Sequence, residues 1–475
     1  MSTTTTRVDN QAGLTAALVL VVVCVGVVSS LGAPLIPAIA ESRHVSPSAA
    51  QWSLTITLLT GAVLAPVLGR LGDGPRRREV VLVTLALVAA GCVLAAPDWG
   101  FATLLVGRAL QGLGLGLMPL GVAVLRDHLD PPRVRRAVVL VSISSVAGAG
   151  VGYPVSGALA AVGGVGASFW FGAGVVVVAL AVAARVLPTG RHLDRAHLDV
   201  PGAVLLGLGV AGLLLVLSQG RQWGWSSPEV VALAVLSPAL LAVFVRHEQR
   251  AATPLVDLRL LRHGPVLVAD LTALTAGVGV YLLMSSVSWL LQSPATGGGF
   301  GLSTLVAAGA MVPFSVTSVA TAQLAVPRLV ERLGDAWSMP IGCLVFAVSM
   351  GLLAVLRDQP WQAYLVMGVG GVGAGCTFSS MPSVIVRAVP SGEVGSATGL
   401  NQVMRSIGYA TGAAAFAAVL AAYADPRTGS TPPGGFAVAA WIGVAVFAGT
   451  AMVDLVLLRG RRAPARHEPE LVTPP

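Results

Sequence analysis

Residues 101–119 read FATLLVGRALQGLGLGLMP, a stretch in which Arg108 carries the only charge. Continued to residue 125, the stretch is long and apolar enough to cross a bilayer as a helix. At about 1.5 Å per residue, Arg108 would lie roughly 10 Å inside the hydrocarbon, where a guanidinium costs about 2.5–3.5 kcal/mol. A charge at this depth indicates a residue that faces a partner or a cavity inside a helix bundle. The alternative is an arginine that snorkels from a helix end into water, and the depth disfavours it.

The composition also indicates a membrane protein. Hydrophobic residues make up 55% of the 475 and charged residues only 11%, whereas about 25% of a soluble domain is charged. The net charge of +8 is dispersed over short loops, so nucleic acid is not an expected partner. The cysteines and histidines have no metal-ligand spacing, and no nucleophile–base set lies inside an apolar run. We therefore expect a protein that is not an enzyme, has no cofactor and has the lipid bilayer as a partner.

The apolar runs predict an all-α polytopic protein, because only helices satisfy their own backbone hydrogen bonds in lipid. Fourteen runs are long enough to span: 14–39, 52–71, 79–97, 101–125, 136–161, 165–187, 200–218, 229–245, 265–291, 301–326, 338–356, 361–386, 395–422 and 435–458.

The runs group as six, two and six around two polar stretches. This grouping predicts a first six-helix bundle over 1–190, a linker with two extra helices over 191–262, a second bundle over 263–458 and a basic, proline-rich tail over 459–475.

The arginines predict the orientation. Of the 29 basic residues, all arginine, 23 fall on the side of the N-terminus, four fall on the other side, and Arg108 and Arg405 lie within spans. We therefore expect an inner-membrane protein with both termini in the cytoplasm.

The loop between the second and third spans, 69–78, reads GRLGDGPRRR. A carboxylate beside an arginine cluster on a glycine turn can form a breakable charge latch, with Gly69, Asp73, Arg76 and Arg77 as its residues. The alternative is a plain topology signal, which explains the arginines but neither Asp73 nor the glycines.

The fourth and fifth spans carry small residues at helical spacing. The fourth has Gln111 and Gly112 beside Arg108, and the fifth has a glycine run around one proline, comprising Gly148, Gly152, Pro154 and Gly157. Small residues four apart allow two helices to approach closely, and a proline bends its helix. Taken alone, each of these features is also explained by simple packing.

In this order the three stretches resemble the signatures of the major facilitator superfamily, and the span count resembles its fourteen-span drug:proton antiporter branch. Residues 390–408, PSGEVGSATGLNQVMRSIG, are similar to a second-half motif of that branch and contribute Asn401 and Arg405. The resemblance implies two six-helix bundles that rock around a central cavity, driven by a proton gradient. It also implies that Asp73 latches with Arg76 and Arg77, that Arg108 takes part in coupling, and that the glycines of the fifth span form a bending interface between the halves.

The sequence departs from the branch because its first span has no acid. Only Asp270 and Asp454 fall clearly within spans. Asp270 is the candidate proton carrier, with a helix-end carboxylate paired to Arg259 or Arg262 as the alternative. Asp454, little more than a turn before Arg459, is interpreted as half of a surface ion pair.

The sequence therefore predicts a monomeric secondary transporter that exports amphipathic small molecules. The alternatives are an importer of a sugar or organic acid and, less favoured, a membrane enzyme or sensor. Aromatic rings and methionines suit an adaptable cavity; the candidates are Tyr153, Trp170, Tyr281, Met284, Trp289, Phe314, Met381 and Tyr409.

Overall fold

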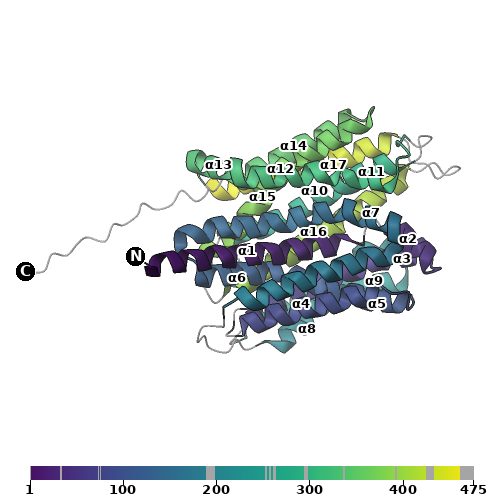
Figure 1. Cartoon of the computed structure of the whole chain (residues 1–475). Helices are drawn as coiled ribbons and strands as arrows, with labels where there is room; N and C mark the ends of the chain where they lie inside the picture. Colours follow the sequence, from purple (N-terminus) through teal and green to yellow (C-terminus); the bar gives the residue numbers. More distant parts are fainter. Residues whose placement is uncertain are drawn as a thin grey trace, which may run out of the picture.

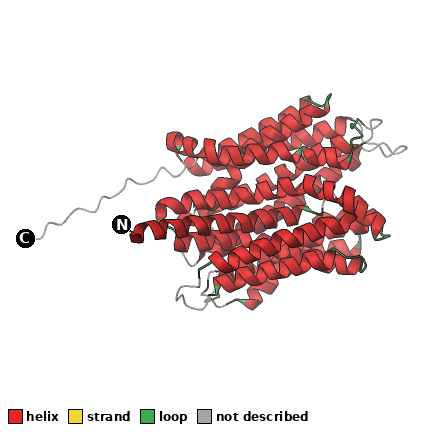
Figure 2. Ribbon diagram, viewed as in Figure 1, coloured by secondary structure: helices red, strands yellow, loops and turns green. Residues whose placement is uncertain are grey.

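The computed structural model describes residues 2–32, 35–72, 74, 76–188, 198–251, 254–255, 258–259, 264–293, 298–334, 337–390, 393–423 and 433–459. Within these residues the chain is helical and has no strand (Figure 2). The elements are α1 (Ser2–Ser30), α2 (Ile36–Ser42), α3 (Pro47–Gly72), α4 (Arg77–Ala95), α5 (Phe101–Gly112), η1 (Leu113–Gly116), α6 (Leu117–His128), α7 (Pro131–Val186), α8 (Val200–Trp223), α9 (Pro228–Glu248), α10 (Gly264–Gln292), α11 (Thr304–Gly309), α12 (Met311–Ala320), the π-helix η4 (Thr321–Ala325), α13 (Val326–Leu333), α14 (Ser338–Val355), α15 (Pro360–Ala388), α16 (Val394–Tyr423) and α17 (Pro433–Arg459).

The described residues hold 13 helical stretches that are long and apolar enough to cross a membrane. One of them, within α7, is interrupted by Gly163 and Gly164. Gly164 has φ +69°, a conformation that glycine adopts at no steric cost. This break falls between the predicted spans 136–161 and 165–187, so α7 crosses twice and the predicted fourteen passes are confirmed.

The helices lie side by side, with those of the first part of the chain at the bottom of Figure 1 and most of those of the second part at the top. Helix α1 packs mainly on α7, and α10 packs mainly on α16. The two parts meet where α7 contacts α12 and α15, and where α3 contacts α16. These contacts bring together helices that are far apart in the sequence.

The extra pair α8 and α9 packs together on one flank of the bundle. A separate apolar cluster joins Leu206 and Val210 of α8 to Ala62 of α3 and to Leu400 and Val403 of α16. The pair therefore covers the seam between α3 and α16. The predicted domain limits at 190 and 262 fall outside the described residues, so the division into bundles and linker remains a prediction.

Helix α1 begins and α17 ends at the same end of the bundle, drawn on the left in Figure 1. Residues 74, 129–130 and 390 lie at this end as well, because each follows an even number of crossings counted from the start of α1. We call it the arginine-rich end, since the predicted loops there carry most of the arginines.

Candidate functional site

Arg108 of α5 is fully buried, with 0% of its surface exposed. Its Nε donates to the Ser53 carbonyl of α3 at 3.0 Å, and its Nη1 donates to Gln111 Oε1 at 2.6 Å and to the Val28 carbonyl of α1 at 3.4 Å. Among the described residues no carboxylate forms an ion pair with it. The guanidinium does not snorkel to a surface, and its protein partners are neutral oxygen atoms.

One nitrogen of this guanidinium, Nη2, is buried without a hydrogen-bond partner. It lies against Gly32, where a Cβ would stand 2.8 Å from Arg108 Cζ. Tyr153 and Cys92 lie within electrostatic range of the same guanidinium. Because an unsatisfied buried donor costs about 1–3 kcal/mol, this corner of the site is suited to an acceptor or an anionic group.

Gln111 and the neighbouring glycines hold α5 in place. Gln111 Nε2 donates to the Gly91 carbonyl of α4 at 3.1 Å. A Cβ on Gly91 would lie 2.6 Å from the Gly107 carbonyl oxygen, and a Cβ on Gly112 would collide with the Thr57 carbonyl of α3. The glycine spacing that the sequence shows therefore lets α4 and α3 pack directly on the helix that carries Arg108.

The two arginines within spans have similar surroundings. Arg108 Cζ lies 5.8 Å from the centre of the Phe169 ring, and Arg405 Cζ lies 5.6 Å from the centre of the Phe378 ring. Each arginine also donates to a glutamine three residues away in its own helix, which is Gln402 for Arg405. An aromatic face attracts a cation when both are removed from water. Sequence reasoning missed these rings, because they lie on other helices.

Asp270 of α10 is buried and faces Asn401 of α16. Asn401 Nδ2 donates to Asp270 Oδ1 at 2.9 Å and to the Ala269 carbonyl at 3.1 Å. Asp270 Oδ2 is buried and has no hydrogen-bond partner. No ion pair joins it to Arg259, and Arg262 lies outside the described residues. The structure thus brings two predicted site residues together, and no ion pair to Asp270 is formed by the described residues; the pair with Arg262 stays an untested alternative.

Asp454 of α17 is placed differently from the surface pair that the sequence predicted. It is 1% exposed, and its Oδ1 lies within hydrogen-bond distance, 2.6 Å, of Thr272 Oγ1 on α10. Residues five apart in a helix point about 140° away from each other, so Asp454 faces the helix bundle rather than the side of Arg459. The side chain of Arg459 lies outside the described part of the chain. The predicted surface location was wrong.

Three of the cavity candidates form a tyrosine cluster. The rings of Tyr281 on α10 and Tyr409 on α16 have centroids 6.5 Å apart. Tyr153 of α7 lies within electrostatic range of both and of Arg108. A tyrosine offers an apolar ring and a polar hydroxyl, which together suit an amphipathic molecule. The cluster therefore lies where helices from the first and second parts of the chain meet.

The other cavity candidates differ from the three tyrosines in burial. Met284 is half-buried one turn beyond Tyr281 on α10. Phe314 and Met381 are buried among the core side chains, whereas Trp170 and Trp289 have 53% and 49% of their surfaces exposed. Such exposed tryptophans are typical of residues that contact lipid or the membrane interface.

The glycines of α7 face two different helices. A Cβ on Gly148 or Gly152 would collide with the backbone or side chains of α1, and Gly152 lies against Val27 and Ser30. Gly157 lies instead beside Leu305 of α11, with 3.6 Å from its ideal Cβ to Leu305 Cδ1. Pro154 lies between them inside the helix. The expectation that all these glycines face the other half was therefore incomplete: Gly148 and Gly152 pack within the first half.

The two arginines of the predicted latch have different carboxylate partners. Arg77, 5% exposed, donates through Nη1 to Asp127 Oδ2 of α6 at 2.5 Å and to the Ala123 carbonyl at 3.0 Å. Arg76 is exposed, and its Nε lies 3.8 Å from a carboxylate oxygen of Glu79. Asp73 lies outside the described residues. The carboxylate that Arg77 binds is therefore Asp127, which sequence reasoning did not single out.

Gly69 makes a direct contact between the two parts of the chain at the arginine-rich end. A Cβ at this position would collide with the backbone carbonyl of Gly395 at the start of α16 and would lie 3.2 Å from Ser396 N. Further along the same seam, a Cβ on Gly399 would lie 3.0 Å from the Ala65 carbonyl oxygen of α3. The backbones of α3 and α16 touch because glycines stand on both of them.

Replacing Gly69 with alanine is expected to slow transport while the protein remains in the membrane. The added methyl group prevents α3 and α16 from closing at this end. If it makes the closed conformation about 1.4 kcal/mol less stable, the transport rate falls about tenfold. Rates in membrane vesicles, normalised to the amount of protein, measure the effect. Gly174→Ala is the matched control, since nothing lies within 4 Å of its ideal Cβ. Equal rates for both variants would contradict the role given to this contact.

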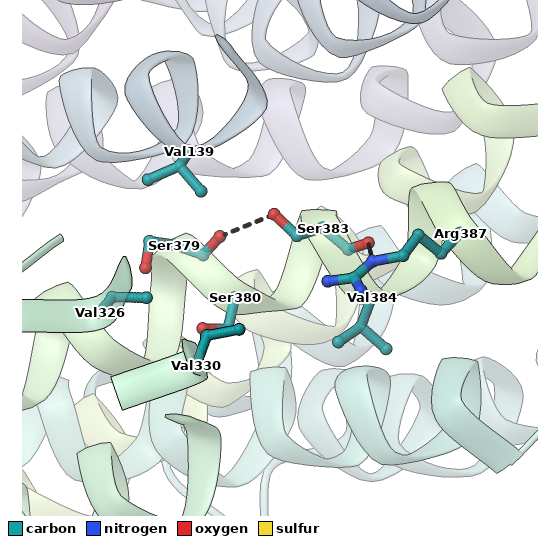
Figure 3. A pocket seen from close by; sticks show the side chains of 8 residues that line it. All are labelled: Val139, Val326, Val330, Ser379, Ser380, Ser383, Val384 and Arg387. Atoms are coloured by element: carbon teal, nitrogen blue, oxygen red, sulfur yellow. Dashed lines mark hydrogen bonds between the residues drawn. The ribbon is translucent and has the colours of Figure 1, made fainter. Parts of the chain in front are cut away.

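A narrow pocket lies at the arginine-rich end between α7, α13 and α15 (Figure 3). Its lining is a stripe of α15 side chains opposite valines of the other two helices: Ser379, Ser380, Ser383, Val384 and Arg387, with Val139, Val326 and Val330. Ser383 donates to the Ser379 carbonyl, and Arg387 Nε donates to the Ser383 carbonyl. None of the predicted site residues lines this pocket, so it is separate from the tyrosine cluster.

Comparison with known proteins gives a consistent result. The profile of the Major Facilitator Superfamily matches residues 18–413 and 271–472. The "Multidrug efflux pump LfrA" of Mycolicibacterium smegmatis is 28% identical over 442 residues, which cover 90% of this chain and 85% of that protein. The "Probable actinorhodin transporter" of Streptomyces coelicolor is 29% identical over 393 residues, covering 80% and 67%. The crystal structure of the human organic anion transporter MFSD10 (TETRAN) superposes with a TM-score of 0.66 at 18% identity, covering 94% of this chain and 99% of that one.

Proposed function

The chain belongs to the major facilitator superfamily, and we propose that it is a proton-driven exporter of amphipathic small molecules that works by alternating access. The observation that carries the proposal is the tyrosine cluster, which α7, α10 and α16 build together beside the buried Arg108. The names of two relatives, a multidrug efflux pump and a probable actinorhodin transporter, support it. We expect the protein to act as a monomer in the bilayer.

The seams between the two parts of the chain fit such a cycle. Gly69 and Gly399 allow α3 to touch α16, and Gly150 of α7 lies so close to Ser315 of α12 that a Cβ would collide with its hydroxyl. Contacts between small residues bury little apolar surface, so two helices can separate there at low cost. Opening both seams at one end of the bundle while they stay closed at the other end would expose the tyrosine cluster to one side of the membrane at a time.

The buried charges suggest which substrates bind. Arg108 has no carboxylate partner among the described residues and keeps its Nη2 without a hydrogen-bond partner, while Asp270 accepts from a neutral amide. A site with an unpaired guanidinium favours a neutral or anionic group over a second cation. We therefore propose neutral or anionic amphiphiles as the substrate class, in preference to lipophilic dications.

The function is tested by exposing cells that express the protein, beside an empty-vector strain, to a panel of toxic anionic, neutral and dicationic compounds. Lower accumulation of anionic or neutral compounds, abolished when the proton gradient is collapsed, is the expected result. Higher accumulation would identify an importer, and strong export of dications alone would overturn the proposed substrate class.

We also propose that the protein lies in the inner membrane with its arginine-rich end in the cytoplasm, on the strength of the arginine distribution. Cysteines introduced at Gly190 and Ala463 are expected to be shielded from membrane-impermeant thiol reagents in intact cells, whereas one at Arg427 should be labelled. The four native cysteines are buried and provide the unlabelled background. Labelling at position 190 in intact cells, without labelling at 427, would reverse the orientation.

A further inference from the structure

A second buried carboxyl group lies outside the site described above. Asp454 of α17 points at α10, where its Oδ1 lies 2.6 Å from Thr272 Oγ1. Its other oxygen, Oδ2, is buried and has no hydrogen-bond partner. The side chain is thus enclosed by protein and held by a single hydroxyl group.

The distances around Thr272 show which partner supplies the hydrogen. Thr272 Oγ1 also lies 2.7 Å from the Val268 carbonyl oxygen, one turn earlier in α10. Both separations match an O–H···O hydrogen bond, which requires one hydrogen in each contact. A threonine hydroxyl has only one hydrogen and a carbonyl has none. Each bond has a hydrogen of its own if the carboxyl group of Asp454 is protonated and donates to Thr272 Oγ1. The Thr272 hydroxyl then donates its own hydrogen to the Val268 carbonyl.

The described side chains around Asp454 give no compensation for a carboxylate. Helix α17 packs on α10, α14 and α16. Among the described titratable and charged side chains of these helices, the Cys343 thiol of α14 is the one that interacts electrostatically with Asp454, and a thiol carries no positive charge. An unpaired buried carboxylate is far more costly than the neutral acid. The charge balance therefore agrees with the hydrogen count.

This acid is separate from Asp270. Positions 270 and 272 of α10 are about 200° apart around the helix axis. Asp270 accordingly meets Asn401 of α16, while Thr272 meets Asp454 of α17. Two carboxyl groups therefore lie on opposite sides of one helix, at nearly the same depth.

We propose that Asp454 and Thr272 form a second proton-binding site, and that a proton occupies it in this conformation. Loss of that proton places a bare negative charge between α10 and α17 and weakens their packing, so α10 responds to proton release on both of its faces. Only the use of this site in coupling rests on the proposed transport function; the binding of a proton does not.

Infrared difference spectra of the purified full-length protein in lipid nanodiscs, titrated with pH, test the proposal. The carbonyl stretch of a protonated carboxyl group is distinct from the bands of a carboxylate. Wild type is expected to show a protonated-carboxyl band at neutral pH that Asp454→Asn loses and Asp270→Asn keeps. Glu229→Gln is the matched control, because Glu229 is exposed at the start of α9. Identical neutral-pH spectra for wild type and Asp454→Asn would overturn the site.

Two further variants keep the test decisive if Asp454→Asn does not fold. Thr272→Val removes the hydroxyl and should shift the band, whereas Thr272→Ser retains the hydroxyl and should leave it in place. A band that does not move in Thr272→Val would contradict the hydrogen bond on which the proposal stands. All of these readouts are independent of transport, so a failed transport assay would count against the proposed function and not against this site.

Discussion

Arg108→Ala is expected to abolish transport while the protein still reaches the membrane. The substitution removes three hydrogen bonds from a charged donor, to Ser53, Val28 and Gln111, each worth about 1.5–3 kcal/mol. It also removes a positive charge that acts on Tyr153. Transport of a neutral or anionic substrate should fall by more than about a hundredfold, since every 1.4 kcal/mol is about a tenfold change. Uptake into inverted membrane vesicles, normalised to the amount of protein, measures it.

Arg108→Lys separates the charge from its geometry. An ammonium group keeps the charge, but it cannot reach Ser53, Val28 and Gln111 at once as the planar guanidinium does. We expect lysine to restore only a small part of the activity. Arg221→Ala is the matched control, because Arg221 is an exposed arginine that donates to the Ala417 carbonyl at 3.3 Å. Full transport by Arg108→Ala would refute the central assignment of the site.

The fold could be predicted from the sequence because the bilayer leaves few options. Apolar runs of about 20 residues must form helices, so length alone located the passes. Even the division of α7 was visible, because the gap between the predicted spans contains Gly163 and Gly164. Arg108 could be singled out for the same reason: a charge inside an apolar run is costly wherever the helix packs.

The contacts of the site could not be predicted in the same way. Asp270 and Asn401 are 131 residues apart, and each was a separate candidate until the packing of α10 on α16 brought them together. A sequence gives the position of a residue along its helix but not how that helix is rotated against its neighbours. This is why Asp454 was expected at the surface and is buried, and why Gly148 was expected to face the other half but packs on α1.

Asp270→Asn is expected to abolish transport driven by a pH gradient while substrate exchange persists. Asparagine has nearly the shape of a neutral aspartic acid and retains a side-chain oxygen. This oxygen can accept from Asn401 Nδ2, which lies 2.9 Å from Asp270 Oδ1 in the wild-type protein. It cannot bind or release a proton. In reconstituted liposomes, accumulation under an imposed pH gradient should therefore fall by at least about tenfold, or about 1.4 kcal/mol of lost coupling. Exchange of labelled for unlabelled substrate at equal pH, measured on the same liposomes, should remain within a factor of about two, because binding is retained.

The combination of the two assays decides what Asp270 does. If Asp270 has only a structural role, gradient-driven accumulation and exchange should fall together. A misplaced α10 would disturb Tyr281 on the same helix as well as Asn401 on the neighbouring helix α16. A proton-carrying role predicts that only the gradient-driven activity falls. Asp358→Asn, at an exposed acid in the loop before α15, should change neither. If Asp270→Asn still accumulates substrate under the gradient, the proton must be carried by another group, and the buried Asp454 becomes the next candidate to test.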